Sequence, residues 1–454
     1  MPYIPHTEAD VQAMLARIGV GKIDDLFDEI PPSLWAKALE TIPEGLNEMQ
    51  LMHAAERLAK ANHSSICFAG GGSYDHHIPA AVWDIASRGE FLTAYTPYQA
   101  EASQGMLQLL YEFQTMLAEL TGLEVANASL YDGASALAEA ALMAVRINKH
   151  SKTKRILVAG TVHPFYRETL DTIVRNQQIE VITLDFDLEK GITPIQVLDQ
   201  YHGEDITALI IPQPNFFGCL ETVDVFTDWA RENRAISIAC VNPLSLALLK
   251  PPGEWGEQGV DIACGEGQPL GAPMASGGPY FGFFSTRLEH VRQMPGRLVG
   301  RTEDITGKSG FTLTLQAREQ HIRRAKATSN ICTNQGLLVT VATLYLSLMG
   351  AEGLRQVALQ CHQNTEALRQ RLLRIDGVKR VFSSSCFHET LIQLPCSAKS
   401  VLEALLNHGI LGGYSVASHY PELQNTLLVC ATEMRTAQEI EQYGVALESI
   451  LKGS

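Results

Sequence analysis

Two short segments of this chain carry enough polar side chains to line a binding or catalytic site. Residues 95–105 combine two phenols with amides, hydroxyls and a carboxylate, just ahead of an apolar helical pattern. Burying such groups is costly unless each finds a hydrogen-bond partner. Residues 318–333 concentrate Arg and Lys beside hydroxyls and amides, a combination that suits a carboxylate or a phosphate. Each segment can be interpreted as the wall of a site or as a solvated surface.

A third candidate is the start of an Ala-rich helix at Asp132, Gly133, Ala134 and Ser135. The first N–H groups of a helix have no partner within it, and together with a small Gly and a Ser hydroxyl they suit a phosphate. A capped helix without any ligand uses the same residue types. This motif alone therefore leaves phosphate binding undecided.

Two further motifs favour simpler interpretations. The Gly-rich turn at 70–73 lacks the spacing of a dinucleotide-binding loop or of a P-loop, which favours an ordinary tight turn. His76 and His77 are adjacent, so their side chains diverge, and no series of Cys, Asp or Glu completes a ligand set around them. We therefore expect no metal site.

The spacing of apolar residues predicts the elements that position these groups. The first sixty or so residues form an amphipathic helical pattern, in which Thr7 and Asp10 make a capping-box-like start. From about residue 154, short β-branched strands recur about every 25 residues with helical stretches between them, which is typical of a mostly parallel sheet covered on both faces. The strands are expected near 155–159, 179–184, 207–212, 235–240, 260–263 and 280–284.

The domain organisation follows from this pattern. We expect an α/β protein with an N-terminal helical arm at 1–65, a large α/β domain at 66–350 and a small α+β C-terminal domain at 351–454. The last boundary is placed at the Gly-containing break after residue 349, where the strand spacing changes.

The composition is that of an acidic protein with a large core. Hydrophobic residues make up 46% of the chain, and 50 acidic against 35 basic side chains give a formal net charge of −15. This sign disfavours nucleic acid and anionic membranes as partners. The first residues lack a signal or transit peptide pattern, and no apolar stretch reaches the roughly 18 residues of a spanning helix, so we expect a cytoplasmic protein. Nine cysteines without a CxxC pair indicate reduced structural thiols.

Three stretches of the sequence are distinctive: TAYTPYQAEASQG at 93–105, LEVANASL at 123–130 and REQHIRRAKATSNICT at 318–333. Together they resemble the glycine decarboxylases, the P-proteins of the glycine cleavage system. The resemblance extends over nearly the whole chain, and it applies equally to the N-terminal half of the long form and to the first subunit of the two-subunit form. It implies the aminotransferase-like fold of pyridoxal-phosphate-dependent enzymes, fold type I.

The resemblance also indicates which catalytic groups are missing. Enzymes of this fold need a Lys that forms a Schiff base with the cofactor and an acidic residue that keeps the pyridine nitrogen protonated. Gln268 stands at the expected Lys position and Asn242 at the acidic position, and neither amide can do this chemistry. His163 matches a ring-stacking His, and Gly133 to Ser135 match the phosphate cup. By homology these are possible remnants, or else a packed His and a capped helix.

The resemblance further implies that the chain pairs with a lysine-bearing relative and that the working site lies at their interface. There glycine binds through pyridoxal phosphate held by the partner, CO2 leaves, and the aminomethyl group passes to the lipoyl arm of the H-protein, as in glycine dehydrogenase (aminomethyl-transferring). This chain would supply part of the wall. The candidates are Tyr95, Tyr98, Gln99 and Glu101 as hydrogen-bonding groups, and Arg323, Arg324, Lys326, Ser329 and Asn330 as groups facing an anion.

Two other functions remain open from the sequence. The chain could be a structural or regulatory partner whose own pocket is dead. It could also be a self-sufficient pyridoxal-phosphate enzyme that uses another lysine, for which Lys250 is the candidate. The expected assembly is a closed hetero-oligomer, most simply a heterotetramer with two copies of each subunit.

Overall fold

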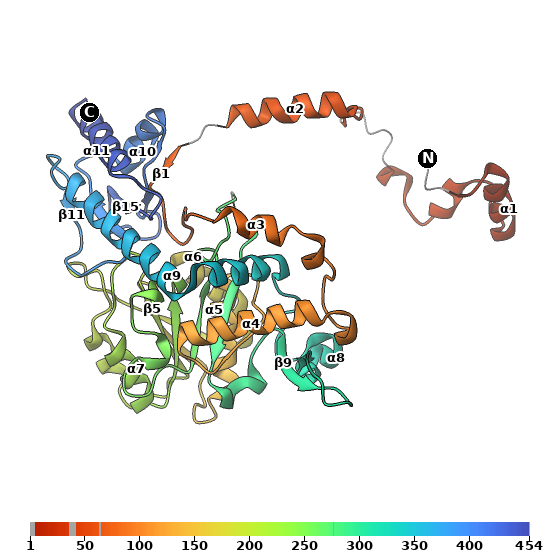
Figure 1. Ribbon diagram of the computed structural model, residues 1–454, viewed down its shortest axis with the longest axis horizontal. Helices are drawn as coiled ribbons and strands as arrows, with labels where there is room; N and C mark the ends of the chain where they lie inside the picture. Colours follow the sequence, from red (N-terminus) through yellow and green to blue (C-terminus); the bar gives the residue numbers. More distant parts are fainter. Residues whose placement is uncertain (1–4, 36–41, 63–64, 276, 454) are drawn as a thin grey trace. The chain divides into compact units, whose positions relative to one another are not determined.

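The chain divides into two units, residues 1–63 and residues 64–454, which are described one at a time (Figure 1). The computed structural model describes residues 5–35, 42–62, 65–275 and 277–453.

The first unit is helical. It contains α1 (Glu8–Ile18) and α2 (Glu48–Ala61), with the short 3-10 helices η1 (Ile23–Phe27) and η2 (Pro32–Leu34) between them. The predicted capping box at the start of α1 is confirmed, because the Thr7 hydroxyl accepts from the N–H of Asp10 while the Asp10 carboxylate accepts from the N–H of Thr7. Most large apolar side chains of this unit are exposed.

A seven-stranded sheet forms the centre of the second unit. In spatial order its strands are β2 (Val125–Ala126), β8 (Gly282–Thr286), β7 (Ile262–Glu266), β6 (Ile236–Val241), β5 (Ala208–Gln213), β3 (Arg155–Ala159) and β4 (Glu180–Leu184). The strands from β3 to β7 are parallel to one another, whereas β8 is antiparallel to both of its neighbours. The predicted mostly parallel sheet is therefore confirmed.

Helices cover both faces of this sheet (Figure 1). One face packs against α4 (Gln104–Thr121), α7 (Val223–Glu232) and α9 (Gly336–Leu372), and the other against α5 (Gly133–Ile147) and α6 (Pro164–Val174). Along β3, Leu157 belongs to the first core, while Ile156 and Val158 belong to the second. Because successive side chains of a strand point to opposite faces, strands covered on both sides must be apolar throughout.

Helix α9 is the one described helix whose length and composition would allow it to cross a membrane, with a mean hydropathy of 1.6. Half of its apolar window is buried inside this unit, as in the core helix of a globular protein. The helix is interrupted at Gly350, whose φ of 59° and ψ of −178° are not helical. This interruption coincides with the predicted break in the sequence pattern.

After Gly350 the chain builds a four-stranded antiparallel sheet. Its order is β11 (Lys379–Arg380), β12 (Glu389–Gln393), β15 (Thr426–Cys430) and β14 (Tyr414–Ser415), and it is packed by α10 (Ala398–Asn407) and α11 (Ala437–Lys452). Strand β1 (Ile66–Cys67) pairs in parallel with β13 (Ile410–Leu411), so the segment after residue 65 begins beside the C-terminal part of the chain. The division at residue 350 stays a prediction.

Several short elements complete the second unit, and some of them contact α4. They are α3 (Ala80–Ala86), the 3-10 helices η3 (Gly89–Phe91) and η4 (Ala100–Ala102), the hairpin β9 (Leu298–Glu303) with β10 (Ser309–Thr314), η10 (Gln316–Arg318), α8 (Gln320–Arg323) and η11 (Arg324–Lys326). Other 3-10 helices are η5 (Arg175–Gln177), η6 (Ile195–Tyr201), η7 (Pro243–Ala247), η8 (Pro252–Glu254) and η9 (Leu288–Gln293).

Candidate active-site pocket and polar surface

A cavity of about 70 Å3 lies at the carboxyl ends of β5, β6 and β7. Ligands of open α/β sheets bind at this edge. The volume is well below the roughly 300 Å3 at which small-molecule pockets usually begin. The side chains around the cavity therefore determine whether it can hold a cofactor.

The N-terminus of α5 is closed by a carboxyl group of the chain itself. Glu266, the last residue of β7, accepts the backbone N–H of Gly133 through Oε2 at 3.0 Å. Asp132 accepts the N–H of Ser135 at 2.7 Å, and the Ser135 hydroxyl in return accepts the N–H of Asp132. A side chain at position 133 would collide with Tyr166. The N–H groups of Gly133 and Ser135 are therefore already hydrogen-bonded within the chain, as in a capped helix without a ligand.

Burial raises the pKa of Glu266 from its ordinary value of 4.5 to about 8. The N–H groups of Gly133 and Gln268 lower the pKa by stabilising the ionised form, whereas the nearby Asp132 carboxylate raises it. At neutral pH the group that closes the helix end is therefore mainly a neutral carboxylic acid.

The Gly-rich turn is closed in a similar way. Gly71 and Gly72 have φ angles of 79° and 107°, so the predicted tight turn is present. The N–H of Gly71 donates to Oε1 of Glu389 at 2.6 Å, and the Tyr74 hydroxyl donates to Oε2 of the same residue at 2.8 Å. Burial raises the pKa of Glu389 to about 7.

Gln268 is fully buried, and all its polar groups are used. Its side-chain oxygen accepts the N–H of Tyr74 at 2.9 Å, and its amide nitrogen donates to the carbonyls of Tyr74 and Ala272 at 2.9 and 2.8 Å. The amide therefore acts as a clamp that holds the 70–75 segment against the loop after β7. No lysine lines the cavity among the described residues.

Asn242 and His163 are also fully engaged. Asn242, directly after β6, accepts the N–H of Leu244 at 2.9 Å, and its amide nitrogen lies 3.2 Å from Nε2 of His388. His163 donates through Nε2 to the carbonyl of Gly71 at 2.7 Å and accepts the N–H of Phe165 at Nδ1. Burial lowers the pKa of His163 to about 4, so this ring is neutral.

A ring of the protein itself stacks on His163. The Tyr166 ring lies 4.9 Å from the His163 ring at an interplanar angle of 26°. Together with Glu266 at the helix end and the hydrogen-bonded amides of Gln268 and Asn242, this arrangement does not fit pyridoxal phosphate. Lys250 offers no substitute, because it is half-exposed, pairs with Asp224 at 3.1 Å and does not line the cavity.

The two polar segments predicted from the sequence come together outside this cavity. The Arg297 guanidinium lies 5.4 Å from the centre of the Tyr98 ring and donates to the Tyr98 hydroxyl and to the carbonyl of Cys332. The Tyr98 ring also lies 5.6 Å from the ring of His321. Arg297 is nearly buried and was not singled out from the sequence. Its signal is a single Arg in the otherwise uncharged stretch 293–300.

The predicted wall residues are mainly exposed. Tyr95 is 86% exposed and Tyr98 is 49% exposed. The other exposed candidates are Gln99, Glu101, Arg323, Arg324, Lys326 and Asn330. Ser329 is half-buried and accepts the N–H of Ile331 at 3.0 Å. None of these residues lines the cavity at the sheet edge.

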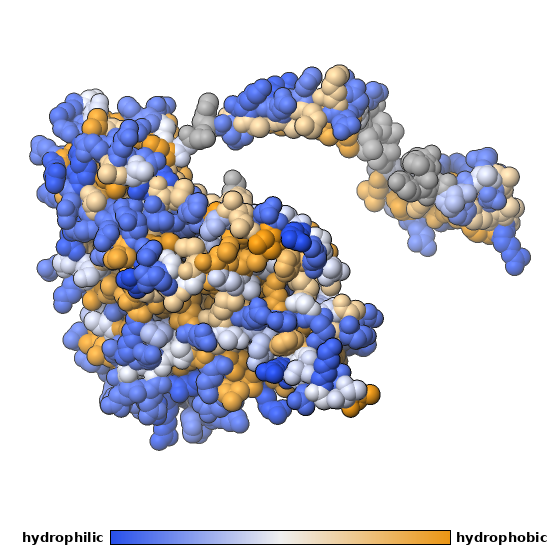
Figure 2. All heavy atoms as spheres, viewed as in Figure 1, coloured by the Kyte–Doolittle hydropathy of each residue, from blue (hydrophilic) through white to orange (hydrophobic). Residues whose placement is uncertain are grey.

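An apolar groove of about 470 Å3 adjoins this polar surface at the N-terminal ends of α4 and α9. Its lining includes Leu92, Tyr95, Pro97, Leu110 and Leu337. Figure 2 shows apolar side chains gathered where α3, α4 and α9 lie. Exposed apolar surface beside a polar cluster is typical of a surface that another protein covers.

Comparisons with known proteins all point to one family. A family model described as glycine cleavage system P-protein matches residues 1–447. A probable glycine dehydrogenase (decarboxylating) subunit 1 from Legionella pneumophila (strain Lens) is 69% identical over 451 residues, covering 99% of each chain. A protein of the same name from Nitrosomonas europaea is 59% identical over 454 residues, covering 100% of each chain.

Solved structures indicate the same family and its fold. A crystal structure of glycine decarboxylase (P-protein) of the glycine cleavage system, in inhibitor-bound form, matches with a TM-score of 0.88 and 43% identity, covering 99% of this chain and 100% of that one. An alanine–glyoxylate aminotransferase from Nostoc sp. matches with a TM-score of 0.60 at 16% identity, which supports the fold alone. The predicted fold type I architecture of pyridoxal-phosphate-dependent enzymes is confirmed.

Replacing Glu266 by Gln should reduce the pH dependence of stability. A carboxyl group whose folded pKa is about 8 and whose ordinary value is 4.5 adds stability that is complete below about pH 4.5 and is lost as the pH rises through 8. This loss is at most about 1.4 kcal/mol for each pH unit between the two values. Glu266→Gln keeps an acceptor for Gly133 and has no such titration.

Urea unfolding at pH 5, 6, 7 and 8 measures the effect. The free energy of unfolding of the unaltered protein should fall more steeply over this range than that of Glu266→Gln. A control, Glu112→Gln on the exposed face of α4, should keep the original slope. Identical slopes for Glu266→Gln and the unaltered protein would show that Glu266 is ionised in the fold.

Proposed function

This chain belongs to the glycine cleavage system P-protein family, and we propose from its closed pocket that it is the subunit of glycine decarboxylase that holds no cofactor. Its relatives are named subunit 1, which implies a second subunit. The cofactor of this fold family is pyridoxal phosphate, and in our proposal the lysine-bearing second subunit holds it at the shared interface.

The observation that carries this proposal is the way the chain fills its own cofactor site. Glu266 occupies the helix end where a phosphate would bind, and Gln268 is consumed by three internal hydrogen bonds. Opening this site would leave buried donors and acceptors without partners, which costs free energy for each group. A subunit with such a pocket can contribute to catalysis only through a surface that faces another subunit.

In the proposed complex, glycine binds through the partner's pyridoxal phosphate, which accepts the electrons released with CO2. The aminomethyl group then passes to the lipoyl arm of the H-protein. The exposed groups around Arg297 supply part of the wall. Tyr95, Tyr98, Gln99 and Glu101 offer hydrogen bonds there, and Arg323, Arg324, Lys326, Ser329 and Asn330 face an anion such as the substrate carboxylate.

The arrangement of these groups supports such a role. Arg297 is nearly buried and holds Tyr98 by a ring contact and a hydrogen bond. The Tyr98 side chain therefore loses less conformational entropy when it binds another group. Arginines that remain exposed on one subunit become effective anion ligands once a partner excludes water from them.

A purely structural or regulatory subunit with a dead pocket is the second candidate function. The closed cavity supports it equally, because both functions dispense with a cofactor on this chain. The wall substitutions below separate the two. Cytoplasmic location and a heterotetramer with two copies of each subunit complete the proposal.

The isolated chain should give no pyridoxal adduct that borohydride can trap. Gln268 has no amine, and Lys250 is held in an ion pair with Asp224 away from the cavity. The chain is incubated with one equivalent of pyridoxal phosphate, reduced, digested and analysed by mass spectrometry, with the lysine-bearing subunit as the positive control. Stoichiometric trapping on Lys250 would favour the self-sufficient enzyme instead.

Substitutions in the wall should lower activity without disturbing assembly. Tyr98→Phe, Gln99→Ala and Arg324→Ala each remove a polar contact, and a contact made only in the transition state is worth about 10-fold in rate per 1.4 kcal/mol. Glycine-dependent CO2 exchange with lipoylated H-protein measures the rate, while light scattering and thermal unfolding check assembly and stability.

The matched control is Arg292→Ala, an exposed arginine outside both polar segments, which should keep full exchange activity. Unchanged activity in all three wall variants would favour the structural subunit.

The chain should associate permanently with the lysine-bearing subunit. An interface that completes an active site should bury on the order of 2,000 Å2 or more and be rich in apolar residues. Size exclusion with light scattering on the co-expressed pair measures the mass. A chain that stays free of the lysine-bearing subunit at micromolar concentration would contradict both the assembly and the function.

The N-terminal helices are candidates for covering the partner. Among the apolar residues of this unit, Leu15 is buried, whereas Ile18, Leu26, Phe27 and Leu34 are exposed. The double variant Phe27→Glu, Leu34→Glu should therefore weaken the complex in the same measurement. Leu188→Glu, at an exposed apolar residue of the other unit, is the control and should not.

A further inference from the structure

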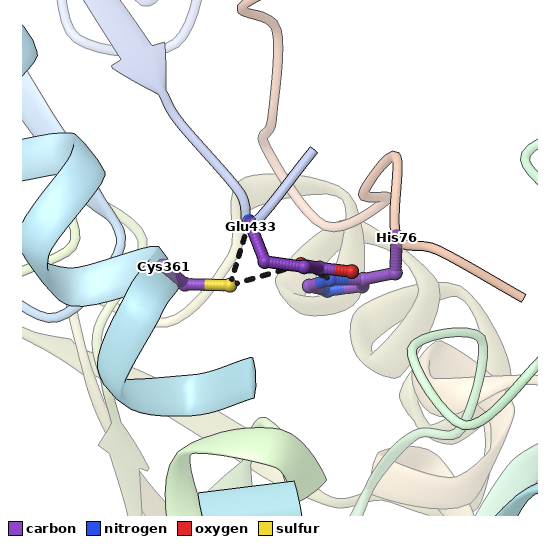
Figure 3. Close-up of side chains that lie close together, drawn as sticks. All are labelled: His76, Cys361 and Glu433. Carbon is purple, nitrogen blue, oxygen red and sulfur yellow. Dashed lines mark hydrogen bonds and ion pairs between the residues drawn. The ribbon is translucent and has the colours of Figure 1, made fainter. Parts of the chain in front are cut away.

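Three potential metal ligands from distant parts of the sequence lie close together (Figure 3). His76 belongs to the segment after the Gly-rich turn, Cys361 to α9 and Glu433 to the connection between β15 and α11. Their ligand atoms all lie within 4.8 Å of one another. Nδ1 of His76 is 2.8 Å and the Cys361 sulfur is 3.2 Å from Oε2 of Glu433.

The sequence predicts no metal site here because neighbours along the chain supply no ligands. The partners of His76 are instead brought in by the fold, with Glu433 357 residues beyond His76 and 72 residues beyond Cys361. His77 does diverge as predicted, and only its backbone N–H reaches Glu433, at Oε1.

Unpaired polar atoms mark the same region. Nε2 of His76, the hydroxyl of Tyr345 and Nδ1 of His388 are buried and have no hydrogen-bond partner among the described residues. Tyr345 is fully buried and lies close enough to Glu433 and Cys361 to interact with both electrostatically. The rings of His76 and His388 are 6.4 Å apart. Each buried polar atom without a partner costs free energy, so their grouping indicates a ligand that the protein chain does not supply.

We propose that His76, Cys361 and Glu433 bind a Zn2+ ion, with a water molecule near the Tyr345 hydroxyl as the fourth ligand. A thiolate, an imidazole and a carboxylate together suit Zn2+ better than Mg2+ or Ca2+, which prefer all-oxygen sites. On binding, the Cys361 thiol gives its proton to solvent, the proton between His76 Nδ1 and Glu433 Oε2 moves to Nε2 of His76, and the hydrogen bonds to Glu433 Oε2 are replaced by bonds to the metal.

All three ligand atoms lie within 4.8 Å of one another, so Zn2+ binding requires a local rearrangement of their side chains. Tetrahedral Zn2+ with bonds of roughly 2.0–2.3 Å keeps its ligand atoms roughly 3.3–3.7 Å apart. The nitrogen–oxygen and sulfur–oxygen distances of 2.8 and 3.2 Å therefore need to lengthen by only about half an ångström. Without metal, the two hydrogen bonds to Glu433 hold the ligands close to their bound positions.

The ion would fasten the 74–77 segment to α9 and to the β15–α11 connection. Tyr74 in that segment holds Gln268 through two backbone hydrogen bonds and Glu389 through its hydroxyl. The proposed zinc therefore has a structural role, in which it stabilises the closed pocket, and it takes no part in the chemistry of the partner's site. This inference does not depend on the proposed function.

The test uses the full chain, purified with a tag that contains no His, stripped with a chelator and dialysed against Zn2+. Elemental analysis should find one Zn2+ per chain. Cys361→Ser should retain none, although a Ser hydroxyl can still make both hydrogen bonds with Glu433 and so preserves the structural contact. Cys332→Ser, at an exposed cysteine, should retain one.

Co2+ in place of Zn2+ provides a second readout. The unaltered protein and Cys332→Ser should show a thiolate-to-cobalt charge-transfer absorption that Cys361→Ser lacks. Circular dichroism of the metal-free proteins checks folding, and His76→Gln replaces Cys361→Ser if the latter does not fold. Absence of bound Zn2+ in the unaltered protein, or its retention in the ligand variants, would leave only a hydrogen-bonded cluster with internal water and overturn the proposal.

Discussion

Two buried glutamates determine the state of the pocket, because they satisfy backbone N–H groups that would otherwise be free for an external anion. Glu266 closes the N-terminus of α5, and Glu389 closes the Gly-rich turn. Such positions attract negative charge, since free N–H groups and the helix dipole point toward them. In this protein the hydrogen-bond acceptor at each position is a carboxyl group of the chain itself. Binding an external phosphate would therefore first require the loss of an internal hydrogen bond.

The same two residues connect the parts of the second unit. Glu266 ends a strand of the large sheet, whereas Glu389 begins a strand of the small antiparallel sheet. The 70–77 segment runs between them and is held by Glu389, Gln268 and Glu433. The pocket therefore lies where the large sheet, the small sheet and the 70–77 segment meet, and its polar groups hold these parts together by hydrogen bonds. Burial raises the pKa of both Glu266 and Glu389 to near neutrality, since charging them inside the protein is costly.

Exposed polar groups lie elsewhere on the unit. The two segments rich in phenols, amides and arginines gather around Arg297 and stay exposed, beside an apolar groove. A protein with a filled pocket and an exposed polar surface beside an apolar groove is suited to contact another subunit. Fold type I supplies the scaffold, and the function of this subunit depends on which groups its surface presents.

The sequence alone determined what depends on residue type and on local periodicity. Apolar strands about 25 residues apart specify a parallel sheet covered on both faces, and the Thr7 capping box forms from residues three apart. The Gln268 side chain cannot form an imine in any fold. Only the tertiary structure decided that Glu266 bonds to Gly133, 133 residues earlier, and that Glu389 bonds to Gly71, 318 residues earlier. It likewise brought Arg297 to Tyr98 and Glu433 to His76. Local patterns arise from neighbours within one or two helical turns, whereas contacts between distant segments depend on how all the elements pack together, which no short stretch of sequence encodes.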